Sequence, residues 1–228
     1  MKTRLIHKAK TAGMVLVVIS LITGCSLLGR GNQSDKTPEQ LMSEGIAKFS
    51  DGYYEDAAER FRELTDRYPY SKLAVQAELK LADSLLKNED FEAALEEYKE
   101  FESLHPKNKS IPYVIYQQGM CYFLRMNTTD RDQTNTVKAL NEFERLQRAF
   151  PFDDYSLKAQ DHIEQCLTNM AEHELYVGRF YFRSGHYKAA LNRFHYLLEH
   201  YPDHSPREKV LSYISECQEK VDQEASSE

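Results

Sequence analysis

The chain has 228 residues, of which 41% are hydrophobic and 29% are charged. This balance permits one large domain or a repeat array, and it is too polar for a protein with several membrane spans. A formal net charge of −7 argues against a general nucleic-acid-binding protein, because neutralising phosphates requires a basic face. Since the chain has no Trp but 15 Tyr and 11 Phe, we expect a core of these rings and Leu.

The first 24 residues have the pattern of a secretory signal. They begin with four basic residues: Lys2, Arg4, Lys8 and Lys10. The apolar run that follows at 14–22 is too short to cross a membrane as a helix. It ends at Gly24-Cys25, and a small residue directly before Cys resembles the lipobox of bacterial lipoproteins. That resemblance implies cleavage before Cys25, which then carries S-diacylglycerol and an N-acyl chain. An ordinary signal peptide or a membrane anchor is the alternative.

The segment after the signal is expected to be a tether. Residues 25–36 are rich in Gly, Ser and Asn, which favours a flexible linker between the lipid and the folded part. Ser26 is not acidic, and by the same class resemblance this implies transfer to the outer membrane. Cleavage removes four basic residues and no acidic ones, so 25 Lys and Arg face 36 Asp and Glu, a net charge of −11.

Three further cysteines, Cys121, Cys166 and Cys217, lie within helical patterns far apart in sequence. An odd number cannot pair completely, so we interpret them as small buried hydrophobic residues. One disulfide with a free thiol is the alternative.

An internal repeat organises the rest of the chain. Four prolines each follow an Ala by 12 residues, and an aromatic residue lies four positions after that Ala. The sets are Ala57/Phe61/Pro69, Ala94/Tyr98/Pro106, Ala139/Phe143/Pro151 and Ala190/Phe194/Pro202. The spacing matches the second helix of the 34-residue tetratricopeptide repeat, in which small residues allow close helix packing and Pro ends the helix.

The first helix of each repeat should carry a small residue 12 positions before the Ala. Gly45, Ala82 and Gly178 fit, whereas Gly119 lies 20 positions before its Ala. The excess of eight residues falls within 126–135, so we predict a loop inserted in the third repeat. A plain helical bundle does not explain the fixed spacing.

The fold class predicted is all-α: a right-handed tetratricopeptide-repeat solenoid of about nine helices. Repeats one to three are expected at 37–151, with helices at about 38–50, 54–68, 72–88, 91–105, 111–125 and 136–150. Residues 152–222 are expected to hold a long helix at 155–183, the rest of repeat four at 187–201 and a terminal capping helix. Two antiparallel helices joined near Asn169 are the alternative to the long helix. The polar residues 223–228 are expected to fray.

No catalytic motif is present, so we expect a protein that is not an enzyme and needs no metal or cofactor. His200 and His204 are separated by Pro202, which breaks the helix that would align them on a metal. Paired carboxylates such as Glu96-Glu97 fit solvated helix faces.

A peptide-binding groove is the better-supported site. In tetratricopeptide repeats the first helix of each pair lines the concave surface, and by that analogy the early repeats present mainly aromatic and aliphatic side chains. The groove residues predicted are Phe49, Leu79, Asp83, Lys87, Tyr113, Tyr116 and Phe123. Such a surface suits an extended apolar or aromatic peptide. For any single ring, packing between helices is an equally acceptable interpretation.

A small basic patch is predicted near the C-terminus. Arg179 and Arg183 lie one helical turn apart, and Lys188 and Arg193 follow on the next helix. On an acidic chain these residues favour an acidic protein partner. A role in solubility through i,i+4 pairs with Glu is the alternative.

Several longer phrases are more specific than the generic repeat: RYPYS at 67–71, PYVIYQQG at 112–119, TDRD at 129–132, AEHE at 171–174, YVGRFY at 176–181 and AALNRF at 189–194. With the lipobox, they closely resemble the BamD (ComL-like) family of lipoproteins in the β-barrel assembly (Bam) machinery. The resemblance covers nearly the whole mature chain. Longer family members complete a fifth helix pair, and this chain is expected to stop after its first helix.

The resemblance implies a non-enzymatic scaffold, lipid-anchored on the periplasmic face of the outer membrane, with BamA, other Bam subunits and unfolded outer-membrane proteins as partners. It implies that the C-terminal repeats bind BamA, with Arg193 at the matching position; Arg179 and Arg183 are added from their proximity in sequence. It also implies that the N-terminal repeats receive the aromatic-rich C-terminal segments of clients. The TDRD phrase is expected to order the inserted loop through local ion pairs. The alternatives are a periplasmic adaptor for cell-wall or cell-division enzymes, and a cell-wall enzyme or its direct activator.

Overall fold

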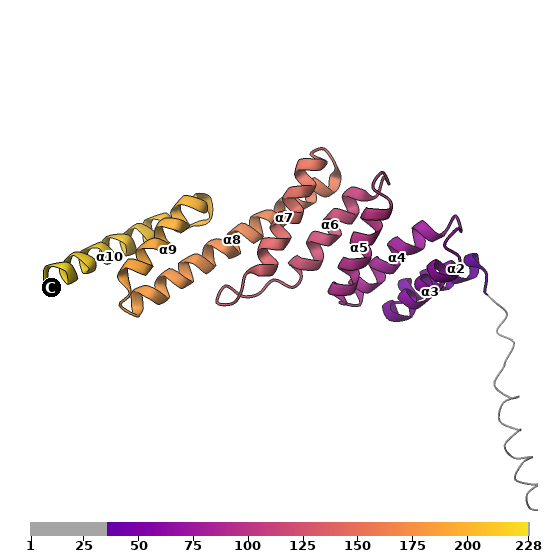
Figure 1. Ribbon diagram of the computed structural model, residues 1–228, viewed down its shortest axis with the longest axis horizontal. Coiled ribbons are helices and arrows are strands. Elements are labelled where there is room, and N and C mark those ends of the chain that lie inside the picture. The colour runs from indigo at the N-terminus through magenta and orange to yellow at the C-terminus, as the bar shows by residue number, and fades with distance from the viewer. Residues whose placement is uncertain (1–35, 228) are drawn as a thin grey trace, which may run out of the picture.

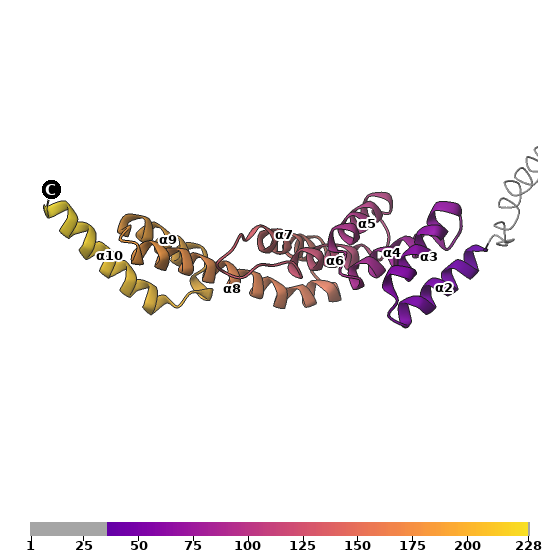
Figure 2. The same cartoon turned by 90° about the horizontal axis from the view of Figure 1, so that it is seen from below.

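The computed structural model describes residues 36–227, and this part of the chain is almost entirely helical. Its elements are α2 (Pro38–Ser50), α3 (Tyr54–Arg67), α4 (Ala74–Lys87), α5 (Phe91–Leu104), α6 (Ile111–Phe123), α7 (Thr134–Ala149), α8 (Asp154–Arg183), α9 (Tyr187–His200), the 3₁₀ turn η1 (Pro202–His204) and α10 (Arg207–Ser227). Consecutive helices pack antiparallel along an extended, gently arched array, with α2 and α10 at opposite ends (Figures 1 and 2). The predicted all-α tetratricopeptide-repeat solenoid is confirmed. The signal and Cys25 lie outside the described residues.

Repeat packing follows the predicted spacing of small and aromatic residues. A Cβ added at Gly119 would lie only 2.5 Å from Cε1 of Phe143, a ring that is fully buried. The same close approach recurs in three pairs: Gly45–Phe61, Gly119–Phe143 and Gly178–Phe194. Absence of a side chain on the first helix therefore lets the ring of the second helix sit against its backbone.

Local signals set the helix ends. Thr37 and Gln40 form a capping box at the start of α2, and Pro38 occupies its first turn. Gly52 and Gly185 have φ of +83° and +76° in the turns that follow α2 and α8. This left-handed conformation favours Gly because a Cβ would be strained there.

Helix α8 is a single helix of 30 residues, so the alternative of two antiparallel helices is wrong. Its first half packs on α6 and α7, and its second half packs on α9 and α10. Two hydrophobic clusters result, one through α2–α8 and the other through α8–α10, and Leu167 of α8 packs against both. Figure 1 shows α8 bridging the two parts of the array. No helix within residues 36–227 has the length and apolar character needed to cross a membrane.

The C-terminal helix α10 extends to Ser227, beyond the expected end near residue 222. No Gly or Pro occurs after Pro206, so nothing in the sequence stops the helix. Cys121, Cys166 and Cys217 are buried and unpaired, as expected of small hydrophobic residues. Burial raises the pKa of the Cys121 and Cys166 thiols to about 12, which keeps them protonated and unreactive.

The inserted loop of repeat three lies between α6 and α7, where the spacing predicted it. Its order comes from hydrogen bonds rather than from the ion pairs that we expected. Asp132 accepts from the backbone N–H and hydroxyl of Thr134, both at 3.0 Å, and Asp130 accepts from the hydroxyl of Thr128. These short side chains bond to neighbours in the turn, which satisfies both carboxylates locally.

Candidate functional site

A pocket of about 390 Å³ opens where α4, the start of α6 and the start of α8 meet. We call it the concave pocket. Its lining combines aromatic, aliphatic and charged side chains: Leu79, Lys80, Asp83, Lys109, Ser110, Pro112, Tyr113, Asp153 and Tyr155. Three of the predicted groove residues, Leu79, Asp83 and Tyr113, are brought together here.

Asp83 is the centre of a polar network at the base of this pocket. Its side chain is buried, with 8% of the residue exposed, and Oδ1 accepts hydrogen bonds from the hydroxyls of Tyr98 at 2.8 Å and Tyr113 at 2.5 Å. Lys80 donates to Oδ2 at 3.1 Å. Burial, reinforced by the Asp83 charge, raises the pKa of both tyrosines, so they stay protonated as donors. The network therefore fixes the Tyr113 ring in the pocket wall.

Two lysines and two aspartates lie beside the rings of the pocket, and one of the lysines, Lys80, is paired with Asp83. The ammonium of Lys80 lies 5.2 Å from the ring centroid of Phe49, and Lys109 is exposed on the segment before α6. The rings of Tyr113 and Tyr155 meet edge to face, with centroids 5.2 Å apart. This combination can hold an aromatic side chain and an anionic group at the same time.

Tyr116 and Phe123 pack between helices, which is the alternative to a groove position for any single ring. The Tyr116 hydroxyl lies 3.0 Å from Nε2 of His162 on α8, and the Phe123 and His162 rings are 4.6 Å apart. Burial lowers the pKa of His162, so its ring is neutral at pH 7. The first half of α8 therefore covers this end of the predicted groove. Phe49 and Lys87 lie at the ends of α2 and α4, outside the pocket lining.

The predicted basic patch is divided between two faces. Arg193 of α9 pairs with Glu174 of α8 at 3.0 Å and lines a separate pocket of about 380 Å³ with Tyr181 and Tyr196. At 100° per residue, Arg179 and Arg183 lie about 140° and 180° around α8 from Glu174. A single flat partner surface therefore does not contact all three arginines.

Sequence reasoning missed Lys80, Lys109 and Tyr155 as pocket residues. Lys80 directly follows the groove position Leu79 in sequence, and the side chains of both residues line the pocket. Tyr155 opens α8, where Asp153 caps the helix by accepting from the Tyr155 N–H at 2.9 Å. The Asp153 cap could have pointed to Tyr155 in the sequence, because it sets the residue at which α8 begins beside α6. The residues described by the structure contain no group of three or more side chains arranged to hold a metal ion.

The profile of the YfiO family, described as outer membrane lipoprotein, matches residues 34–228. The chain belongs to the YfiO family. The match spans every described helix and the concave pocket.

Curated relatives carry the name outer membrane protein assembly factor BamD. The protein from Rickettsia prowazekii is 29% identical over 192 residues, which are 84% of this chain and 76% of the relative. The protein from Vibrio cholerae is 27% identical over 216 residues, covering 90% and 89% of the two chains. Among solved structures, a tetratricopeptide repeat protein from Parabacteroides merdae aligns with a TM-score of 0.43 and 17% identity, over 83% of this chain and 75% of its own.

Proposed function

We propose that this chain is a non-enzymatic scaffold subunit of the machinery that assembles β-barrel proteins in the outer membrane. Membership of the YfiO family and relatives named as outer membrane protein assembly factors support this role. In the proposal, lipid on Cys25 holds the chain at the periplasmic face of the membrane. Residues 25–36 then act as a tether that lets the acidic solenoid stand away from the lipid surface.

The concave pocket carries the proposal that the chain receives unfolded clients. Its tyrosine rings offer stacking partners for an aromatic side chain, and the exposed Lys109 offers a partner for a carboxylate. The C-terminal residue of a polypeptide that ends in an aromatic residue presents both groups on one unit. The pocket therefore supports capture of the C-terminal segment of an unfolded outer-membrane protein.

Lys109→Glu tests this assignment with little effect on folding, because Lys109 is exposed and lies outside the helices. We expect binding of a client C-terminal peptide ending in Phe to weaken about tenfold, since attraction to the terminal carboxylate becomes repulsion. Fluorescence anisotropy with the full chain in detergent measures the dissociation constant.

The matched control is Lys107→Glu, which makes the same charge change two residues before Lys109. Lys107 is also exposed, but it lies outside the pocket lining. It should leave binding unchanged. A peptide with an amidated C-terminus should bind the unsubstituted chain more weakly than the free peptide does, because amidation removes the charge that Lys109 attracts. Equal binding of free and amidated peptides would remove the carboxylate from the proposal.

Contact with BamA is assigned in the proposal to the face of α8 and α9 that carries Arg193. Arg193 is 44% exposed at its side chain while its guanidinium pairs with Glu174, whose side chain is 12% exposed. Arg193 also lines the pocket beside Tyr181 and Tyr196. An acidic side chain of the partner could complete this arrangement. Arg179 and Arg183 are kept as a second, separate contact face.

A further inference from the structure

Two aromatic side chains in the turns between repeats are almost fully exposed. Tyr70 lies between α3 and α4 with 99% of its surface exposed, and Phe152 lies between α7 and α8 with 97% exposed. Among residues 36–227, the next most exposed large hydrophobic side chain, Leu157, reaches 68%. Each ring directly follows the proline that ends its repeat, Pro69 or Pro151. Exposure that recurs at one repeat position is a pattern rather than scatter, and neither the client nor the BamA assignment uses it.

Both rings lie on one edge of the array. Because consecutive helices are antiparallel, the turns between repeats lie along one edge and the turns within repeats along the other, at the upper and lower sides of Figure 1. We call the first the inter-repeat edge. Its turns are residues 68–73, 105–110, 150–153 and 201–206. The turns of the opposite edge are residues 51–53, 88–90, 124–133 and 184–186.

The proposed lipid anchor joins the fold at the inter-repeat edge. The hydroxyl of Tyr68, just after α3, donates to the carbonyl of Lys36 at 2.8 Å, which fixes the first described residue at this edge. Cys25 precedes Lys36 by 11 residues, so the connection spans at most about 40 Å. A tether of this length lets the solenoid stand away from the lipid or rest on it, and the chemistry of the edge decides between the two.

The two edges differ in charge. The turns of the inter-repeat edge have a balance of +1, from Lys72, Lys107, Lys109, Asp153 and Asp203. The turns of the opposite edge have a balance of −3, from Asp51, Glu89, Asp90, Arg125, Asp130, Arg131 and Asp132. On an acidic chain, the inter-repeat edge is therefore the one that an anionic lipid surface repels less.

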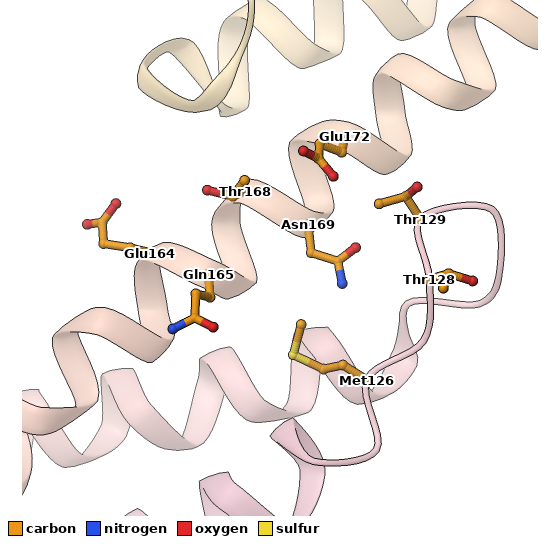
Figure 3. A pocket seen from close by; sticks show the side chains of 8 residues that line it. All are labelled: Met126, Thr128, Thr129, Glu164, Gln165, Thr168, Asn169 and Glu172. Atoms are coloured by element: carbon orange, nitrogen blue, oxygen red, sulfur yellow. The ribbon is translucent and has the colours of Figure 1, made fainter.

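The opposite edge is also polar where the inserted loop lies. Figure 3 shows this loop beside the middle of α8, with Thr128 on the loop and Glu164 and Glu172 on the helix. The hollow between them has one apolar side chain in its lining, Met126. Carboxylates and hydroxyls of this kind would lose hydration against lipid, so this edge is the poorer membrane contact.

We propose that the inter-repeat edge rests on the lipid surface of the membrane, with the rings of Tyr70 and Phe152 in the headgroup region. Lys72 and Lys107 lie on the same edge and meet anionic headgroups. Tyrosine and other amphipathic rings concentrate at the boundary between membrane and water, and lysines near the surface are attracted by anionic lipids. The inference rests on the lipid anchor of the proposed function.

This contact would set the concave pocket beside the membrane. Lys109 and Asp153 belong both to the inter-repeat edge and to the lining of the pocket. A client segment bound there would be held next to the bilayer that receives it.

Tryptophan fluorescence tests the contact, because the chain has no Trp and one introduced Trp reports on a single position. Tyr70→Trp and Phe152→Trp place the probe on the inter-repeat edge, and Tyr53→Trp is the matched control in an exposed turn of the opposite edge. Each full, lipidated chain is reconstituted in vesicles of phosphatidylethanolamine and phosphatidylglycerol, with lipids brominated near the headgroup. We expect bromine to quench at least about half of the emission from positions 70 and 152, and less than about a tenth from position 53.

Lys72→Glu in the Phe152→Trp chain should lower this quenching at least about twofold, because phosphatidylglycerol repels the new carboxylate. Lys220→Glu, an exposed change of the same charge on α10, should leave it unchanged. Unquenched emission from the Tyr70→Trp and Phe152→Trp chains that float with the vesicles would overturn the contact and leave the lipid anchor in place. Equal quenching at all three positions would do the same. Chains that fail to float would overturn the anchor and the contact together.

Discussion

At the scale of single residues, three phenylalanine rings lie directly against the backbone of a glycine on the neighbouring helix. Gly119→Ala would place its Cβ 2.5, 2.7 and 3.0 Å from three ring carbons of Phe143. In an exposed helix Gly→Ala stabilises by about 1 kcal/mol, but here the ring has no free space to move into. We expect a net loss of about 1–3 kcal/mol in the free energy of unfolding, measured by urea denaturation.

The double variant Gly119→Ala with Phe143→Leu provides the control, because it removes the ring that the new methyl group meets. Gly119→Ala should cost less free energy of unfolding when it is added to Phe143→Leu than when it is made alone. The difference between the two costs is the coupling energy of the pair. An increase in stability for Gly119→Ala by itself would contradict the packing seen between α6 and α7.

The sequence predicted these residue pairs because the contact is local and periodic. A small residue and a ring recur at fixed spacing, and each pair joins adjacent helices. The Asp83 network could not be predicted in the same way, since its donors come from α4, α5 and α6. The covering of Tyr116 by His162 depends on where α8 crosses α6, and repeat spacing carries no information about that.

At the scale of elements, α8 connects the two hydrophobic clusters. Thr168→Pro places a proline at an exposed position in the middle of this helix. It removes the hydrogen bond from residue 168 to the carbonyl of Glu164 and costs about 3 kcal/mol or more. We expect thermal unfolding, followed by circular dichroism, to separate into two transitions, with α9 and α10 melting first because their cluster is the smaller.

Thr168→Ala is the control for this element and should keep a single transition, since Ala preserves the backbone hydrogen bond. Hydrogen exchange adds the location: α9 and α10 should lose protection in the proline variant, whereas α2–α5 should not. One unshifted transition would mean that the two halves are not coupled through α8. The length of α8 was predictable because residues 155–182 contain no Pro and only one Gly, Gly178. The sequence did not predict which face each half of α8 buries.

At the scale of the whole molecule, the net charge and the extended shape both bear on how partners bind. The expected mature chain carries −11, and its helices are spread along an extended array rather than packed into a sphere (Figures 1 and 2). Distant parts of the surface can therefore serve different partners. The concave pocket and the Arg193 face occupy separate positions along the chain. The sequence proximity of the three arginines does not place them on one face, because helix geometry sets Arg179 and Arg183 about 140° and 180° around α8 from Glu174, the partner of Arg193.

The Arg193 face gives the last prediction, which concerns assembly. Arg193→Glu would set two carboxylates against each other, because Arg193 pairs with Glu174 at 3.0 Å. Loss of BamA from a detergent pull-down would then have two possible causes: a lost partner contact or a disturbed α8–α9 packing. The double variant Arg193→Glu with Glu174→Arg restores the internal pair with its charges exchanged.

From the proposed contact we expect the single and the double variant both to recover less than about a tenth of the BamA recovered by the unsubstituted chain, because the acidic group proposed on the partner would meet a carboxylate at position 193 in each. Circular dichroism should show the double variant folded, and Lys220→Glu, an exposed change on α10, should recover BamA fully. Recovery by the double variant would instead make Arg193 a residue that positions α9 on α8. The BamA contact would then belong to the other face, where Arg179 and Arg183 lie about 40° apart around α8.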